Sequence, residues 1–374
     1  MTAATIDQHS LAPIWEWYPQ DLTPFSSLWW FFLLCPEERA AGGRTAFGPR
    51  QIMLTLVSRV GETVTINGVT HDGLQPQDVT APFPAYTIAW MHTGQKMFGH
   101  IANEAGTGQV TPGEGIRTWT PEGFGSEIRA GGNRPFAVTA RFQGPGGGGE
   151  FEAWGDPASP ITAPYQVHRN SRFGSADVVA WRRLEFAGTF TTPAGSESLS
   201  GLGYFQRICL DIMPFPWKWL WLLFADGSVL SCFIPFLGPH LLRRGDWFFN
   251  GFLENLTLPL QQSAYFWDAG TGEQFALKPR IGVRPGANGH LPRFAVSCEA
   301  GSGDYLLFEA IPYAHHQVLL DRPLLRGRWQ SRYNYNEYVV RSSSLTGRLN
   351  GRPLDVPRYG QGYGNMEYSW GLGL

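Results

Sequence analysis

The stretch of residues 201–236, GLGYFQRICLDIMPFPWKWLWLLFADGSVLSCFIPF, constrains the fold more than any other part of the chain. Within it Trp217, Trp219 and Trp221 recur at every second position, which puts all three indoles on one face of an extended backbone. Lys218 and two leucines occupy the other face. Helical spacing would scatter the indoles, and the Asp-Gly pair that follows is typical of a tight hairpin turn. The stretch therefore predicts two antiparallel strands, one of them strongly aromatic on one face.

Composition favours an all-β chain with more than one domain. The 374 residues include 46 glycines and 28 prolines, spread along the chain, and only 16% are charged. This profile is typical of many short strands joined by turns, and the length exceeds what one hydrophobic core usually supports. The net charge of −2 gives no basic field for nucleic acid.

The four cysteines lie far apart without C-x-x-C spacing, and the histidines are not spaced as metal ligands. We therefore expect no metal site and no disulfide framework. The beginning of the sequence has no signal-peptide pattern, and its apolar runs are shorter than the roughly 20 residues of a membrane helix. We expect a cytoplasmic protein that needs no cofactor, and peripheral contact with a membrane stays open.

Further strands are predicted from alternation and turn residues at 28–34, 51–60, 62–68, 83–104 and 178–192. The glycine-rich run GPGGGGEFEAW has no helix after it, so a flexible hairpin loop is favoured over a phosphate-binding loop.

An internal repeat predicts the domain organisation. Four residues recur at the same spacing in two parts of the chain: Gly188, Gly201, Gly203 and Tyr204 match Gly347, Gly360, Gly362 and Tyr363. Each half also begins with a Trp-rich strand. We therefore predict two similar antiparallel β-domains in tandem, residues 1–200 and 201–374.

Three motifs resemble one known family. They are the Trp-Trp-Phe-Phe strand near the start, the W-x-W strand ending in Asp-Gly, and the closing G-x-G-Y-x-x-x-E. Together they resemble the lipocalin-like superfamily of carotenoid 1,2-hydratases, attachment-protein homologues, tocopherol cyclases and Diels–Alderase-type proteins, over most of the chain. The resemblance implies two lipocalin-like antiparallel β-barrels with a ligand cavity in or between them. It also implies long, apolar, unsaturated substrates such as isoprenoids, carotenoids or polyenes.

The chain departs from this family at positions that matter for chemistry. Leu28 stands where members often carry an acidic residue, and Gln206 and Arg207 stand where an Asp commonly follows the first G-x-G-Y. In the hydratases an Asp of that region is thought to donate the proton. Asp211 is the nearest carboxylate here, and Glu367 belongs to the second G-x-G-Y motif.

Glu367 and Asp211 are the candidate acids for protonating an alkene. A carboxyl group held in an apolar pocket keeps its proton near neutral pH, because burial disfavours the charged form. The structural alternatives are a carboxylate satisfied by backbone or Arg for Glu367 and a turn cap for Asp211.

A pericyclic reaction needs no acid, only a pocket that folds the substrate and a donor aimed at a carbonyl. Gln206, Arg207 and Lys218 are the candidate donors. Arg207 could equally form a structural ion pair, and Lys218 could extend to solvent.

The segment WQSRYNYNEY (329–338) is expected to place Tyr333, Tyr335 and Glu337 on one face of a strand. This strand either lines a pocket with polar groups or has one face exposed to solvent. The residues expected to bind substrate are Trp29, Trp30, Tyr204, Trp217, Lys218, Trp219, Trp221, Tyr338 and Tyr363.

Three functions remain open. The first is a cofactor-independent enzyme that hydrates, cyclises or isomerises a long unsaturated substrate in an aromatic-lined pocket. The second is a non-catalytic carrier of such lipids. The third is a carbohydrate-binding β-protein, which requires indoles exposed in an open groove.

Overall fold

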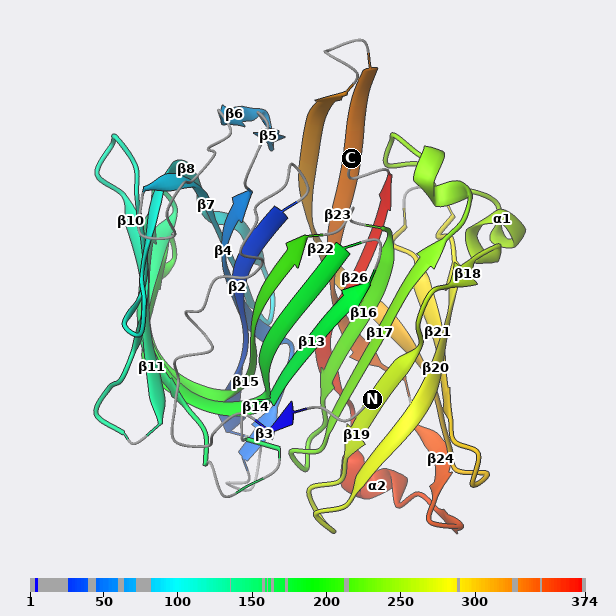
Figure 1. Cartoon of the computed structure of the whole chain (residues 1–374). Helices are drawn as coiled ribbons and strands as arrows, with labels where there is room; N and C mark the ends of the chain where they lie inside the picture. Colours follow the sequence, from blue (N-terminus) through cyan, green and yellow to red (C-terminus); the bar gives the residue numbers. More distant parts are fainter. Residues whose placement is uncertain are drawn as a thin grey trace. The chain divides into compact units, whose positions relative to one another are not determined.

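The computed structural model describes residues 4–5, 26–39, 45–59, 64–71, 82–134, 136–156, 159, 161–162, 165–171, 174–211, 215–287, 290–324, 329–343 and 345–371. Strands dominate, and they form two closed antiparallel β-barrels of ten and eight strands, as the all-β, two-barrel prediction requires (Figure 1). None of the helices in these residues is long and apolar enough to cross a bilayer.

The first barrel closes where its last two strands pair with each other, β14 with β15. Its ten strands are β2 (Ser26–Arg39), β4 (Arg50–Arg59), β7 (Phe83–Thr93), β8 (Met97–Thr111), β9 (Gly115–Trp119), β10 (Gly125–Ala130), β11 (Ala137–Gly144), β12 (Gly147–Trp154), β14 (Gly174–Thr192) and β15 (Gly195–Asp211). Three short strands extend this sheet: β1 (Ala4–Thr5), β3 (Thr45–Phe47) and β13 (Tyr165–Ser171).

The second barrel closes by pairing of β21 with β22. Its eight strands are β16 (Trp217–Leu223), β17 (Val229–Leu237), β19 (Ser263–Trp267), β20 (Gln274–Arg284), β21 (Arg293–Glu299), β22 (Tyr305–Leu324), β23 (Trp329–Ser342) and β26 (Tyr363–Gly371). The minor elements are β5 (Val64–Ile66), β6 (Val69–His71), η2 (Pro239–Leu242), α1 (Gly251–Asn255), β18 (Leu258–Pro259), β24 (Thr346–Leu349), β25 (Arg352–Pro353) and α2 (Val356–Tyr359).

The chain forms two compact units that divide between Met213 and Pro214, and two short early segments belong to the second unit. The sequence predicts that the second domain begins at residue 201. In the structure this residue lies inside β15, which pairs with β2 and β14 and closes the first barrel. In each barrel the Trp-rich strand pairs with the last strand, β2 with β15 and β16 with β26.

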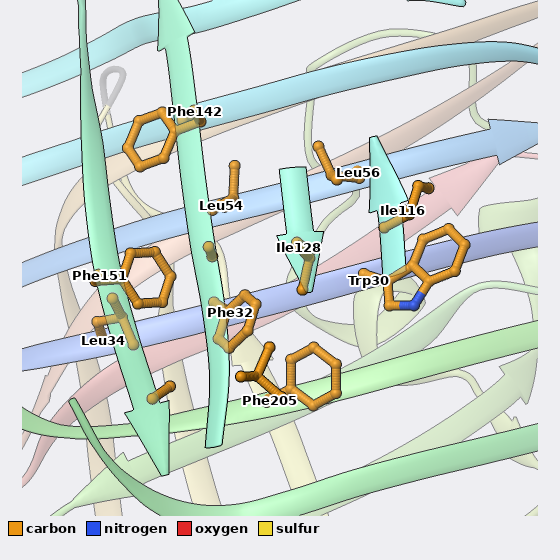
Figure 2. Packing of buried hydrophobic residues seen from close by; sticks show 14 of the residues in the cluster. Trp30, Phe32, Leu34, Leu54, Leu56, Ile116, Ile128, Phe142, Phe151 and Phe205 are labelled. Carbon is orange, nitrogen blue, oxygen red and sulfur yellow. The ribbon is translucent and has the colours of Figure 1, made fainter. Parts of the chain in front are cut away.

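The core of the first barrel follows from alternation along β2. Trp30, Phe32 and Leu34 point inward, where Phe32 meets the ring of Phe205 at 4.5 Å and that of Phe151 at 5.1 Å between centroids. Figure 2 shows these rings packed together with aliphatic side chains from β4, β9 and β10. Aromatic pairs at such separations add to the free energy gained by removing their surface from water.

The hairpin predicted at Asp226-Gly227 is confirmed between β16 and β17. Gly227 has φ = 86°, a conformation that favours glycine, and the Asp226 carboxylate accepts a hydrogen bond from the Ser228 amide at 2.9 Å. The Asn67-Gly68 pair forms a second tight turn, with positive φ at both residues.

The glycine-rich hairpin prediction is only partly correct. A hairpin joins β11 and β12, but the glycines lie largely within β12 and not in a flexible loop. At Gly149 an added Cβ would come within 3 Å of the rings of Phe190 and Phe142. The glycines therefore allow aromatic side chains to cross the strand closely.

Candidate functional site

The candidate site is built on three adjacent strands of the second barrel, β16, β26 and β23. Their register places Trp219 opposite Glu367 on one side and Glu337 opposite Glu367 on the other. Met366 and Tyr368 point into the barrel core, so Glu367 points to the outer face of the sheet. Both carboxyl groups are nonetheless buried.

Aromatic side chains surround the Glu367 carboxyl group. The Trp217 Nε1–H donates to Glu367 Oε2 at 2.8 Å, and Oε1 is buried without a hydrogen bond of normal geometry. The Trp217 ring lies 5.6 Å from both Tyr333 and Tyr335 between centroids. The Tyr333 hydroxyl donates to Ser369 Oγ at 2.7 Å. Trp217 thus holds one oxygen of the acid, and Tyr335 is the second side chain that interacts with the carboxyl group.

Burial raises the pKa of Glu367 from 4.5 to about 7, and hydrogen bonding from Tyr335 and Trp217 opposes this only in part. Burial also raises the pKa of Tyr335 well above 10, and the negative charges of Glu367 and Glu337 add to this effect. Near neutral pH the site therefore holds a carboxyl group that readily exchanges a proton and a phenol that remains protonated.

The raised pKa predicts how stability depends on pH. The folded pKa exceeds the unfolded one, so this contribution is complete below about pH 4.5 and is lost as pH rises through about 7. Glu367→Gln mimics the protonated acid and removes the effect. We expect this variant to match the wild type in unfolding free energy near pH 5 and to exceed it by about 2–3 kcal/mol near pH 9. Urea unfolding of both proteins at the two pH values measures this, and parallel pH profiles would contradict it.

Arg207 lies in the core of the first barrel, on the same face of β15 as Phe205. Its Nη1 donates to Asp177 Oδ2 at 2.5 Å, both side chains are fully buried, and Gln166 Nε2 donates to Asp177 Oδ1 at 2.8 Å. This is the structural ion pair that the sequence left open as the alternative to a catalytic donor.

Gln206 and Tyr204 lie on the outer face of β15, where the Tyr204 hydroxyl donates to Gln206 Oε1 at 2.7 Å. Trp29 shares this face and is half-buried, whereas Trp30 points into the core. The two tryptophans therefore cannot line one pocket together. Asp211 ends β15 and is half-buried, and its role as an acid stays a prediction.

The expectation that Lys218 could extend to solvent is wrong. Lys218 points into the second barrel and is 3% exposed. Its Nζ donates to the Ile281 carbonyl at 2.7 Å and lies 5.3 Å from the Phe236 ring and 5.6 Å from the Tyr368 ring. Burial lowers its pKa to about 8, against the opposing charge of Glu254. Lys218 is therefore on the opposite face of β16 from the indoles.

Tyr338 also points into the second barrel, where it stacks on His315 at 4.6 Å between centroids. Tyr363 begins β26, is half-buried, and donates from its hydroxyl to Gln361 Oε1 at 2.8 Å. The wet-face interpretation of β23 is wrong, because Tyr333 and Glu337 are buried on one face and Asn334, Asn336 and Tyr338 on the other.

The indole row is largely removed from solvent. Trp219 and Trp221 are 5% and 0% exposed, and Trp217 is half-buried. The carbohydrate-binding alternative required this row to be exposed in an open groove, so it is wrong in that respect. A shallow hollow of about 340 Å³ lies instead over β20, β21 and β22, lined by Arg280, Ser297 and Leu307 among others. The enclosed chamber beside the indoles stays a prediction.

Sequence reasoning did not select Tyr335 and Glu337 as site residues. Alternation had placed them on one face of 329–338, but nothing in the sequence pairs that strand with the one that carries Glu367. The sequence did contain one signal for a polar site, the alternation in residues 364–370 (GNMEYSW). It places Asn365, Glu367 and Ser369 on a single face of the strand. All three are buried.

Comparison with known proteins gives the fold. No family model and no curated protein matches the chain. CghA, solved alone and with Sch210972, superposes with a TM-score of 0.52 at 11% identity, covering 100% of this chain and 95% of CghA. Kievitone hydratase from Nectria haematococca gives 0.48 at 10% identity, covering 92% of this chain and 88% of the enzyme. An AttH-type protein from Nitrosomonas europaea gives 0.47 at 12% identity and 98% coverage of both. At this low identity the likeness to CghA shows a shared fold.

Proposed function

We propose that the chain is an enzyme that needs no cofactor and transforms a carbon–carbon double bond of a long, apolar, unsaturated substrate. The observation that carries the proposal is Glu367, a buried carboxyl group whose pKa is raised to about 7 among aromatic side chains. A carboxylic acid that keeps its proton near neutral pH is the group that alkene protonation requires.

Glu367 gives its proton to one alkene carbon, and a carbocation forms at the other. Aromatic faces stabilise such a cation by roughly 0.5–2 kcal/mol for each well-placed ring. In hydration, water adds to the cation and its surplus proton returns to Glu367. In isomerisation, a carbon next to the cation loses a proton to the Glu367 carboxylate, and a double bond forms at the new position. In cyclisation, a second double bond first attacks the cation to form a C–C bond, and the new cation that results then loses a proton to the Glu367 carboxylate in the same way. Glu337 on β23 lies directly opposite Glu367 on β26 and is the second carboxyl group of the candidate site.

Trp217 and Tyr335 are assigned to positioning. The indole N–H holds Oε2 of Glu367, which directs the proton of the acid to the other oxygen. Tyr335 remains protonated because its pKa is raised by burial and by both carboxylates. It supplies a neutral donor beside the acid.

A pericyclic reaction is the competing chemistry and a carrier is the competing class. Of the three donors that the sequence offered for a pericyclic reaction, Arg207 is bound to Asp177 and Lys218 to a backbone carbonyl inside the barrels. Gln206 alone of these three lies on an outer sheet face. Protonation by Glu367 is therefore the preferred mechanism.

The experiment is native mass spectrometry of the purified protein, followed by solvent extraction and incubation of any retained lipid with fresh enzyme in heavy water. We expect a polyene or prenyl chain that gains deuterium at carbon, with the mass of one added water if the reaction is hydration. Conversion without deuterium would indicate a pericyclic reaction, and retention without conversion a carrier. A retained sugar would overturn the proposal.

A further inference from the structure

The connection between β17 and β19, residues 238–262, carries an unusual concentration of exposed apolar side chains. We call it the apolar segment; it contains η2, α1 and β18 and lies at one end of the second barrel (Figure 1). Six of the large hydrophobic side chains that the structure describes as exposed lie in it: Leu242, Trp247, Phe252, Leu256, Leu258 and Leu260. Leu242 and Phe252 are 78% and 74% exposed, which is unusual for side chains of this size.

Three of the five charged or titratable side chains of the apolar segment, His240, Arg243 and Glu254, are fully buried. The other two, Arg244 and Asp246, are exposed, carry opposite charges and lie at the start of the segment, before Trp247. Large apolar side chains dominate the exposed surface that follows, although water favours apolar groups inside a protein. This part of the outer side is therefore suited to a medium other than water.

The inner side of the segment is tied firmly to the barrel. Glu254 accepts hydrogen bonds from Tyr368 Oη at 2.6 Å, Arg243 Nη1 at 3.0 Å and the Phe249 amide at 3.0 Å. Arg243 also packs its guanidinium over the Trp370 ring at 3.6 Å. Because these contacts hold the backbone in place, the exposed apolar side chains cannot turn inward without breaking a buried ion pair.

The exposed surface from Trp247 onward contains no charge. Glu254 is the single ionisable side chain in 247–262, and it is buried. The polar groups that share the surface are amides and a hydroxyl, such as Asn250, Asn255 and Thr257. Leu and Phe beside Trp, with uncharged polar groups around them, match the interfacial layer of a bilayer, where aromatic rings and neutral hydrogen-bonding groups are stable.

We propose that the apolar segment is a membrane-docking surface that inserts into the interface of an uncharged lipid bilayer. This inference rests on the proposed function, since a substrate dissolved in a membrane must be collected there. Tyr368, which bonds to Glu254 of the segment, is the direct neighbour of Glu367 on β26. The docking surface is thus attached to the strand that carries the candidate acid.

The test is flotation of the full-length protein with phosphatidylcholine vesicles, without any substrate. We expect the wild type to float with the vesicles, and the variant Leu242→Ser/Phe252→Ser/Leu258→Ser to lose at least tenfold in partition coefficient. The matched control is Tyr305→Ser/Leu307→Ser, which removes exposed apolar side chains from β22 of the same unit. We expect it to bind as the wild type does. Unchanged thermal unfolding of both variants shows that they fold.

Three outcomes would overturn the proposal. In the first, the wild type fails to float. In the second, it floats only with anionic vesicles and is released by about 1 M NaCl, at which charges are screened beyond about 3 Å. In the third, it sediments as a dimer that the triple variant abolishes, so a second copy covers the segment. Vesicle binding involves no turnover, so failure of the catalytic proposal and failure of this one are separate results.

Discussion

Replacing Glu367 with Gln should lower turnover by about a thousandfold while substrate binding changes little, because general acids typically contribute 10²–10⁴ to the rate. Gln keeps the shape of the side chain and can still accept the Trp217 N–H bond, but it has no proton to transfer. Turnover in the wild type should fall as pH rises above about 7, as the acid ionises. Single-turnover rates and substrate affinity, measured across this pH range, separate the two effects.

Glu299→Gln is the matched control, since Glu299 is an exposed carboxylate at the end of β21 in the same unit. It should leave both rate and affinity unchanged. Full turnover in Glu367→Gln would remove Glu367 from the acid role and leave a pericyclic reaction as the preferred chemistry. A loss of affinity equal to the loss of rate would instead indicate that Glu367 serves binding.

Arg207→Met should have the largest effect on stability, with a loss of about 3–5 kcal/mol in unfolding free energy. The variant leaves the Asp177 carboxylate in the core of the first barrel without its cationic partner, although Gln166 still donates one hydrogen bond. Replacing both partners, as Arg207→Met/Asp177→Leu, should recover most of the loss, because no buried charge then remains. Denaturant unfolding of the three proteins measures this.

Arg332→Met provides the comparison for an exposed ion pair. Arg332 donates to Asp321 at 2.7 Å but is 45% exposed, so its removal should cost less than about 1 kcal/mol. An Arg207→Met variant as stable as Arg332→Met would show that the buried pair contributes nothing beyond a surface one. A double variant no more stable than Arg207→Met would show that packing, not charge, is what was lost.

Local patterns predicted the strands and their faces well. The period-2 spacing of Trp217, Trp219 and Trp221 predicted that the indoles would lie opposite Lys218, and the register of β16 with β26 confirms it. Asp226-Gly227 predicted the turn that follows. These features depend on neighbours in the sequence, since side chains alternate along any extended backbone and a turn needs only a few residues.

The candidate site was predictable only in part. Glu367 was selected from its motif, but its proximity to Glu337 and Tyr335 was not. Lys218 was expected near solvent or substrate, and it lies inside a barrel. From the sequence, Arg207 could equally be a catalytic donor or part of a structural ion pair, and only the structure places Asp177 beside it. Each of these outcomes depends on which distant strand lies alongside.

The sequence by itself determined an all-β chain with two Trp-rich barrel strands, the faces of those strands, and the turns that join them. The tertiary structure alone decided which faces became interior, which charges were paired, and that Glu367 is buried deeply enough to hold its proton near pH 7. The physical reason is the distance along the sequence over which each property is determined. Side-chain direction is set by the local backbone, whereas burial and pKa are set by whatever strands, remote in the chain, close around a residue.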